Sequence, residues 1–226
     1  MKRTGLVFLL VLLSTTGGNA QQSHDVEISV GAGVAFPSSP MTFADYWQPH
    51  YGLSAGAGVP LSESVTLTGS VEYQRFTLDE AGVSGAIDTD YLREIWAFED
   101  VTTVSTAGSS SATTLSANVR VSPSGLSGLL SPYVTAGLGV RWFTLGEIQL
   151  ATTSTLSVNG SHIPMTANQT VIGGTETSAL MQVGLGVDIR AAASFDIFVE
   201  ARYAFGLTRE IGAAYVPLMA GARFRL

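Results

Sequence analysis

Cysteine is absent from this chain of 226 residues. Its absence excludes disulfide bonds, thiolate metal sites and a lipoprotein anchor. An exported chain without disulfides depends on hydrogen bonds and packing for its stability. That is more typical of a bacterial envelope protein than of a small secreted animal domain.

Lysine is almost absent as well, because Lys2 is the only one in the sequence. Without Lys2 and Arg3, nine arginines oppose 18 acidic residues, which gives a formal charge of −9. This acidic balance disfavours nucleic acid and other anionic surfaces as partners.

No apolar run is long enough to form a transmembrane helix, which needs about 20 residues. The run Leu6–Leu13 is short, follows the basic residues Lys2 and Arg3, and precedes the small residues Gly18-Asn19-Ala20. This pattern predicts a secretory signal peptide over residues 1–20 and one mature domain over residues 21–226. A membrane anchor is the alternative, which the shortness of the run disfavours. The mature chain is then either a soluble β-protein or a membrane barrel.

What the chain does contain is segments in which apolar and polar residues alternate with a period of two. In the last twelve residues, Val216, Leu218 and Phe224 share one face of an extended strand, whereas Arg223 and Arg225 share the other. A two-faced strand of this length predicts the closing strand of an outer-membrane β-barrel.

Similar segments recur along the mature chain and predict an all-β fold, an eight-stranded antiparallel up-and-down transmembrane β-barrel. Short connections alternate with longer ones, and three of the longer ones are expected to be irregular. Periplasmic turns and extracellular loops of outer-membrane barrels show the same asymmetry. The predicted strands are 25–36, 51–60, 64–78, 113–121, 132–145, 178–190, 195–207 and 214–226.

Charged residues follow one face of these strands almost everywhere. In the segment 132–145, Leu138 and Trp142 lie on one face, and Gly137 and Arg141 lie on the other. The interior of an eight-stranded barrel is just wide enough for side chains, and a guanidinium can bridge two carboxylates. We therefore expect a plugged lumen, not an open pore. The predicted lumen charge network is Glu27, Glu72, Arg120, Arg141, Asp188, Arg190, Asp196, Glu200, Arg202, Arg223 and Arg225.

Aromatic residues of the apolar face cluster near strand ends. This placement predicts two interfacial girdles, where amphipathic rings prefer the headgroup level of a bilayer. A soluble barrel with its polar face in water is the alternative, but its aromatic residues would more often sit in mid-strand. The predicted lipid-interface aromatics are Phe36, Tyr73, Trp142, Phe195, Tyr203, Phe205 and Phe224.

Three segments resemble strands of the bacterial outer membrane β-barrel family. They are Pro132-Tyr-Val-Thr-Ala-Gly-Leu-Gly-Val-Arg-Trp142, Phe198-Val-Glu-Ala-Arg-Tyr203 and Gly221-Ala-Arg-Phe-Arg-Leu226. The resemblance is to small members such as the transmembrane domain of outer membrane protein A and the outer membrane protein X type, and it covers residues 21–226. It implies an outer-membrane location, outer-membrane lipids as surroundings, and assembly by periplasmic chaperones and the barrel assembly machinery.

Catalytic chemistry has little support in the sequence, so we expect no enzyme and no cofactor. His50, near Tyr51 and Ser54, is the one candidate for a lipid-modifying site with a serine nucleophile. The other histidines, His24 and His162, lie outside the predicted strands. The pairs of glycines two residues apart sit at strand spacing and lack the strand-to-helix turn of a phosphate loop.

The acidic segment 79–100 could bind a divalent cation through Asp88, Asp90 and Glu94, but it lacks the regular spacing of a calcium loop. A solvated acidic loop is the preferred interpretation, and no metal site is predicted. Tyr91, Trp96 and Phe98 in this segment suit packing against the barrel rim better than binding.

The sequence thus predicts an exported outer-membrane barrel with a structural or surface-interaction role. The connections 79–112 and 146–177 are its expected contact surface, for a ligand that the sequence does not identify. A narrow pore for small solutes is the first alternative, and an outer-membrane lipid-modifying enzyme is the second.

Overall fold

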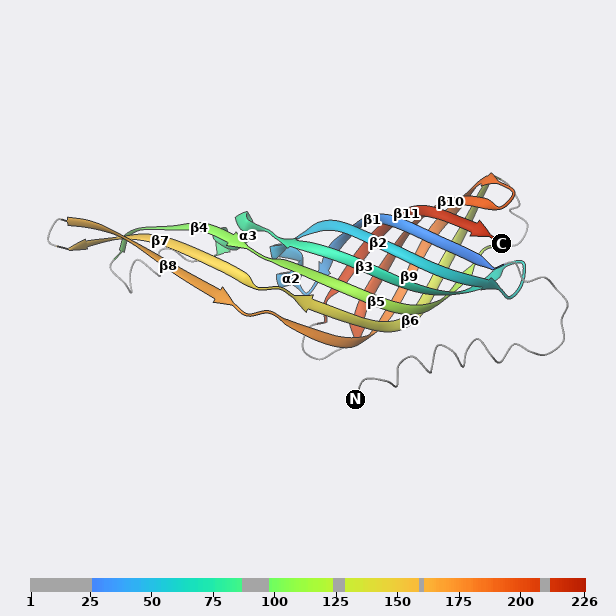
Figure 1. The fold of residues 1–226 in the computed structure, drawn as a ribbon, viewed down its shortest axis with the longest axis horizontal. Helices are drawn as coiled ribbons and strands as arrows, with labels where there is room; N and C mark the ends of the chain where they lie inside the picture. Colours follow the sequence, from blue (N-terminus) through green and yellow to red (C-terminus); the bar gives the residue numbers. More distant parts are fainter. Residues whose placement is uncertain (1–25, 87–97, 124–128, 159–160, 208–211) are drawn as a thin grey trace.

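The computed structural model describes residues 26–86, 98–123, 129–158, 161–207 and 212–226. Eight antiparallel strands close into a barrel (Figure 1), so the predicted fold is confirmed. The signal peptide predicted at residues 1–20 lies outside the described residues. In order around the barrel, the strands are β1 (Glu27–Ser39), β2 (Trp47–Pro60), β3 (Val65–Leu78), β5 (Ser109–Val121), β6 (Leu130–Leu145), β9 (Gly174–Ala192), β10 (Phe195–Leu207) and β11 (Ala214–Arg225).

The barrel strands are staggered, which fixes their tilt. Following paired residues once around the barrel from Glu27 leads back to β1 at Pro37, a displacement of ten residues. With about 3.3 Å per residue and about 4.8 Å between strands, this stagger corresponds to a tilt of about 40°. That tilt is typical of outer-membrane barrels. The successive partners are Gly58, Thr68, Asn118, Gly137, Gln182, Ala204 and Tyr215.

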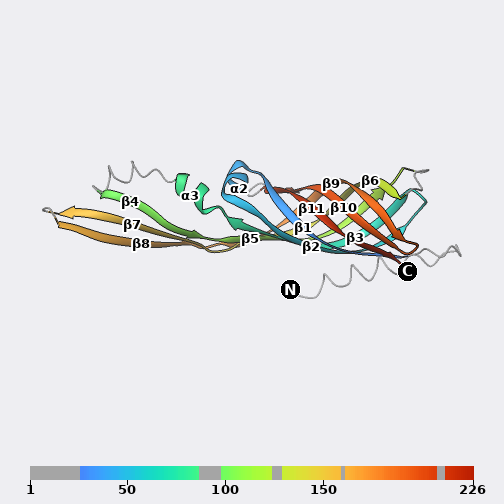
Figure 2. The ribbon, with the colours of Figure 1, turned by 90° about the horizontal axis from the view of Figure 1, so that it is seen from above.

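A three-stranded sheet extends from one end of the barrel (Figures 1 and 2). It consists of β4 (Phe98–Ala107), β7 (Ile148–Val158) and β8 (Ser161–Val171), with β7 in the middle. These strands continue β5, β6 and β9 of the barrel wall with breaks of one or two residues. We call this the protruding sheet, and the opposite end of the barrel the short-turn end.

The protruding sheet corrects one prediction. The connections 79–112 and 146–177 were expected to be irregular, and the structure forms strands in both. These segments are rich in threonine, a β-branched residue that favours strands. Their apolar alternation is weak, since Thr152 and Ser154 interrupt it in β7. Residues 161–170 of β8 are all exposed. The alternation that marks the barrel strands is therefore weaker in them.

Two short helices lie where the barrel meets the protruding sheet, α2 (Met41–Tyr46) and α3 (Glu80–Ala86). The Asp79 N–H donates a hydrogen bond of 2.8 Å to the Tyr46 carbonyl oxygen, which joins the segments that carry them. Among the described residues, neither helix has the length and apolar character needed to cross a membrane.

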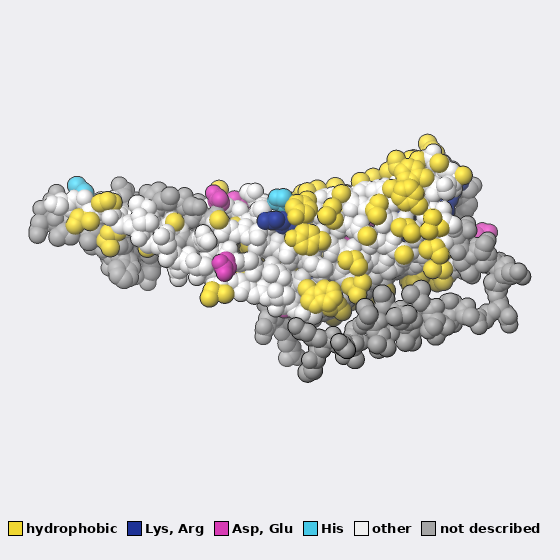
Figure 3. Space-filling model, in the orientation of Figure 1, with side chains coloured by type: hydrophobic (Ala, Val, Ile, Leu, Met, Phe, Trp, Pro, Cys, Tyr) yellow, Lys and Arg dark blue, Asp and Glu magenta, His cyan; other side chains and the backbone are white. Residues whose placement is uncertain are grey.

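The barrel wall has inverted polarity. Large apolar side chains such as Leu138, which is 62% exposed, cover its outside (Figure 3), whereas Arg141 on the inside is fully buried. Strand alternation produces this arrangement, because neighbouring residues point to opposite faces of the wall.

Candidate functional site

The lumen near the short-turn end contains a continuous series of ion pairs. Arg120 lies 2.5 Å from Glu27 and 3.8 Å from Asp188, and Arg223 in turn pairs with Asp188 and lies 3.5 Å from Glu200. Positive and negative groups alternate, and six different strands contribute them. We call this set the charge series. In contact order it is Glu27, Arg120, Asp188, Arg223, Glu200, Arg202 and Glu72.

Aromatic rings hold Arg223 in the middle of the charge series. Its guanidinium carbon lies 4.7 Å from the ring centre of Tyr133 and 4.4 Å from that of Phe198. It also donates a hydrogen bond of 2.8 Å to the Tyr133 hydroxyl. Glycine makes room for this packing, because a Cβ on Gly186 would lie 2.4 Å from the Tyr133 ring. Arg223 is therefore fixed by charge, hydrogen bonding and ring contact together.

Three predicted members of the lumen network lie at the short-turn rim. Arg225 is half-exposed and pairs with Asp196, apart from the charge series. Arg190 has the predicted parity, but its side chain is exposed. Its place in a buried network is therefore wrong, because the strand has already reached the rim at this residue.

Arg141 lies nearer to the protruding sheet than the charge series does, and it is fully buried. It donates hydrogen bonds to the Ser178 hydroxyl, at 3.2 Å, and to the Ala213 carbonyl oxygen. Its guanidinium carbon lies 5.4 Å from the ring centre of Phe143. The sequence predicts Arg141 as a member of the lumen charge network, whereas the structure places it beside the apolar part of the lumen.

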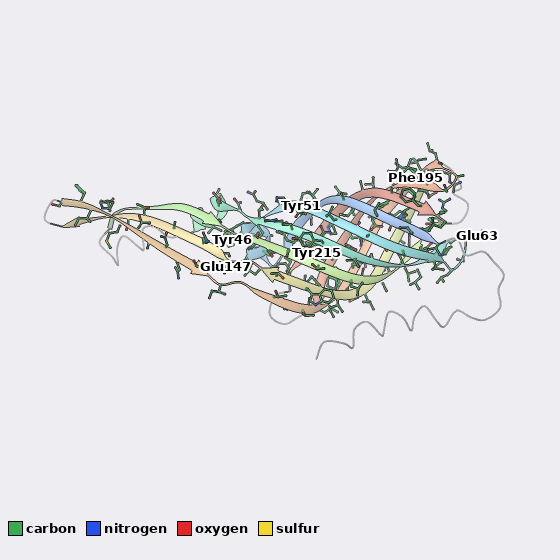
Figure 4. All side chains as sticks on the ribbon, viewed as in Figure 1. Tyr46, Tyr51, Glu63, Glu147, Phe195 and Tyr215 are labelled. Carbon is green, nitrogen blue, oxygen red and sulfur yellow. The ribbon has the colours of Figure 1, made fainter. Side chains whose placement is uncertain are left out.

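The lumen near the protruding sheet is an apolar core. Phe43 of α2 packs at ring-centre distances of 5.1 Å from Phe76 and 5.5 Å from Phe143, and Phe76 lies 5.6 Å from Tyr215 (labelled in Figure 4). We call this set the aromatic core. The prediction of a lumen polar throughout missed it. A signal for it was present in the sequence. Phe76, Leu78 and Phe143 have the parity of inward-facing residues, so the inner face becomes apolar toward the protruding sheet.

A partly open apolar pocket of about 350 Å³ lies beside the aromatic core, at the mouth of the barrel. Residues of α2 and α3 form one side of it, including Phe43, Tyr46 and Val83. Residues of the barrel wall and the first residue of β7 form the other, including Trp47 and Ile148. The volume and the aromatic lining fit a small-molecule site.

A second cavity lies among the charges and is much smaller. Its volume is about 40 Å³, and its lining includes Glu27, Arg120 and Arg202. Since one water occupies at least 10–15 Å³ by this measure, roughly three waters would fill it.

The predicted interfacial aromatics lie on the outer face at two levels. Phe195 and Phe224 are paired residues at the short-turn end, with ring centres 5.1 Å apart. Tyr203 and Phe205 lie at the other end of β10, with ring centres 5.8 Å apart. Phe36, Tyr73 and Trp142 lie toward that same end of their own strands.

The remaining candidate residues that the structure describes are not assembled into a site. His50 and Ser54 are four residues apart on β2, or about 13 Å along the strand. His162 lies in β8. His24 and the possible cation ligands Asp88, Asp90 and Glu94 lie outside the described residues. Within the part of the chain that the structure describes, no three His, Asp or Glu residues are grouped to hold a metal ion.

No family model and no curated protein sequence matches the chain. Solved structures do match it. Neisserial surface protein A aligns with 89% of this chain and 97% of its own, at a TM-score of 0.51 and 16% sequence identity. Outer membrane protein OprG from Pseudomonas aeruginosa aligns with 91% of this chain and 97% of its own, at a TM-score of 0.49 and 11% identity. At such low identity, the likeness to Neisserial surface protein A shows the fold alone.

Proposed function

We propose that this chain, which has the fold of the small bacterial outer-membrane β-barrels, is an integral protein of that membrane with a plugged lumen. Its role is to present the protruding sheet as an interaction surface outside the cell. Residues 1–20 serve as a cleavable signal peptide in this proposal, and lipids of the outer membrane surround the barrel wall.

The spacing of the outer aromatic residues supports the membrane assignment. Phe195 and Phe205 lie on the outer face of β10, ten residues apart. At about 3.3 Å per residue and a tilt of about 40°, their separation along the barrel axis is about 25 Å. That height matches the apolar band of outer-membrane barrels, which aromatic girdles flank at both interfaces.

The filling of the lumen favours a plug over a pore. The charge series and the aromatic core occupy successive parts of the barrel, and the cavity among the charges is only about 40 Å³. Purified protein in a planar bilayer is expected to give no stable conductance steps, and Arg141→Ala is expected to raise conductance by loosening the packing. Stable steps from the unaltered protein would instead support the pore.

The protruding sheet is the observation that carries the interaction role. β8 pairs with β7 and forms one edge of the sheet. Its 11 residues span about 36 Å, far beyond the barrel mouth. Such an edge can add a strand from a partner. Pro164 offers no N–H, so a partner strand would pair better along the following residues of β8.

A labelling experiment tests which end of the barrel faces outward. The absence of cysteine allows single-cysteine variants without background. Ile163→Cys in β8 is expected to react with a membrane-impermeant maleimide on intact cells. Glu63→Cys at the short-turn end (Figure 4) is the matched control, expected to react only after the outer membrane is permeabilised. Labelling of Glu63→Cys alone on intact cells would reverse the proposed orientation.

We also propose that the protein is not an enzyme, because His50 and Ser54 are too far apart along β2 for a nucleophile and its base. If the purified protein hydrolysed or transferred acyl chains of lipids, and if His50→Ala abolished that activity, this part of the proposal would be wrong.

A further inference from the structure

The apolar pocket at the barrel mouth differs in chemistry from the rest of the lumen. Its lining contains no charged side chain. Four aromatic rings contribute to it: Phe43, Tyr46, Trp47 and Phe143. Aromatic faces carry negative electrostatic potential, and they attract organic cations as well as apolar groups.

Acidic residues are sequence neighbours of several lining residues, and acidic side chains also lie near the mouth of the barrel. Asp45 precedes Tyr46, and Glu147 precedes Ile148, and both carboxylates are exposed. Figure 4 shows Tyr46 and Glu147 in the same region, where the barrel meets the protruding sheet, and Figure 3 shows acidic side chains there. Asp79 and Glu80 flank the start of α3, whose Val83 lines the pocket. These charges disfavour an anionic ligand and favour a cationic one.

Within the described residues, the basic side chains of this region are Arg75 and Arg141, and neither lines the pocket. Arg141 is buried and donates hydrogen bonds to Ser178 and Ala213. Arg75 of β3 has the parity of Val71 and Tyr73, which lie on the outer face of the barrel. Gln74 and Phe76, on either side of it, are buried on the inner face. Arg75 is therefore directed away from the lumen.

Buried side chains fill the lumen next to the pocket. The aromatic core lies beside it, and Arg141 and the charge series lie farther down the lumen. A molecule that enters from the side of the protruding sheet is therefore held at the mouth and not passed through the barrel.

We propose that the pocket binds a small organic cation with an apolar body, taken up from the aqueous side that faces the protruding sheet. The apolar body lies against Phe43, Trp47 and Phe143. The positive charge lies over an aromatic face and toward Asp45 and Glu147 at the rim. This binding role goes beyond the proposed surface role and does not depend on it.

The test uses the refolded mature chain in a nonionic amphipathic polymer, because a detergent tail could occupy the pocket. Three probes share a benzyl group: benzyltrimethylammonium as the cation, N-benzylacetamide as the neutral compound and phenylmethanesulfonate as the anion. Calorimetric titration is expected to give saturable binding of the cation to one site. The cation is expected to bind at least about tenfold more tightly than either of the other probes, since the face of an aromatic ring attracts a desolvated cation.

Variants separate the pocket from general attraction to an acidic protein. The double variant Asp45→Asn, Glu147→Gln is expected to weaken cation binding about fivefold, as two partly screened carboxylates would. Glu63→Gln removes one exposed carboxylate at the opposite end of the barrel and is expected to leave affinity unchanged. Thr42→Phe, at an exposed lining position of α2, is expected to fill the pocket and abolish binding without removing a charge.

Four results would each overturn the proposal. They are no saturable binding of the cation, equal affinity for the neutral or anionic probe, an effect of Glu63→Gln as large as that of the rim variant, and unchanged affinity in Thr42→Phe. The labelling of Ile163→Cys on intact cells tests the surface role and is independent of these four results. Failure of this proposal is therefore distinguishable from failure of the surface role.

Discussion

The lumen near the short-turn end and the lumen near the protruding sheet are enclosed by the same strands but filled by opposite chemistry. The first contains the charge series, in which Arg202 contacts both Glu72 and Glu200. The second contains the aromatic core, in which Phe43 and Phe76 meet edge to face. A barrel wall shields its interior from lipid, so either paired charges or closely packed apolar side chains can fill it. Strand parity fixes which side chains point inward, but it does not fix how they fill the interior.

The largest expected effect is at Arg202. Arg202→Met leaves the carboxylates of Glu72 and Glu200 buried without this guanidinium. Breaking a buried ion pair on one side costs about 3–5 kcal/mol, and we expect a loss of that size in the free energy of unfolding. Urea titration of the protein in lipid vesicles measures it.

The double variant Arg202→Met, Glu72→Gln is the control for that prediction. Glu72→Gln removes the buried carboxylate that Arg202→Met leaves without a partner, and it is expected to restore part of the lost stability. If Arg202→Met lowered the free energy of unfolding by less than about 1 kcal/mol, the charge series would not be what stabilises the lumen near the short-turn end.

Leu180 of β9 belongs to the same buried apolar cluster as Phe43 and Phe76, and it tests the packing of the aromatic core. Leu180→Ala removes a buried lumen side chain and leaves a cavity, so we expect a loss of about 2–5 kcal/mol in the free energy of unfolding. Leu138→Ala is the matched control on the outer face. Lipid fills the space left there, so the cavity contribution is absent and the loss is smaller. Equal losses for the two variants would argue against a packed core inside the barrel.

Arg225 is expected to show the smallest effect. It pairs with Asp196 as Arg202 pairs with Glu72, but its side chain is 30% exposed at the short-turn rim. Arg225→Ala is therefore expected to lower the free energy of unfolding by at most about 1 kcal/mol, and by less at high salt. If its loss equalled that of Arg202→Met, burial would not be what distinguishes the two ion pairs.

The eight barrel strands could be predicted from the sequence because each has two different environments. On β6, the apolar Leu138 indicates a lipid-facing position, and the charged Arg141 indicates a lumen-facing one. The predicted ranges accordingly lie close to the observed strands, and β9 differs most, since it spans residues 174–192 and not 178–190.

Other parts could not be predicted, for physical reasons. The protruding sheet has no buried face along residues 161–170 of β8, and its apolar alternation is weaker than that of the barrel strands. The aromatic core depends on Phe43 of α2 meeting Phe76 and Phe143 from distant strands, and this contact has no local signal. The exposure of Arg190 depends on where the barrel ends, which parity does not define.

The most direct test of the account is the environment of the outer wall in a bilayer. A nitroxide label at Leu138→Cys is expected to collide readily with dissolved oxygen and rarely with a water-soluble nickel chelate. The same label at Ile163→Cys, in the protruding sheet, is expected to show the opposite preference. If the nickel chelate reached Leu138→Cys as readily as Ile163→Cys, the apolar wall would not face lipid, and the membrane barrel would be contradicted.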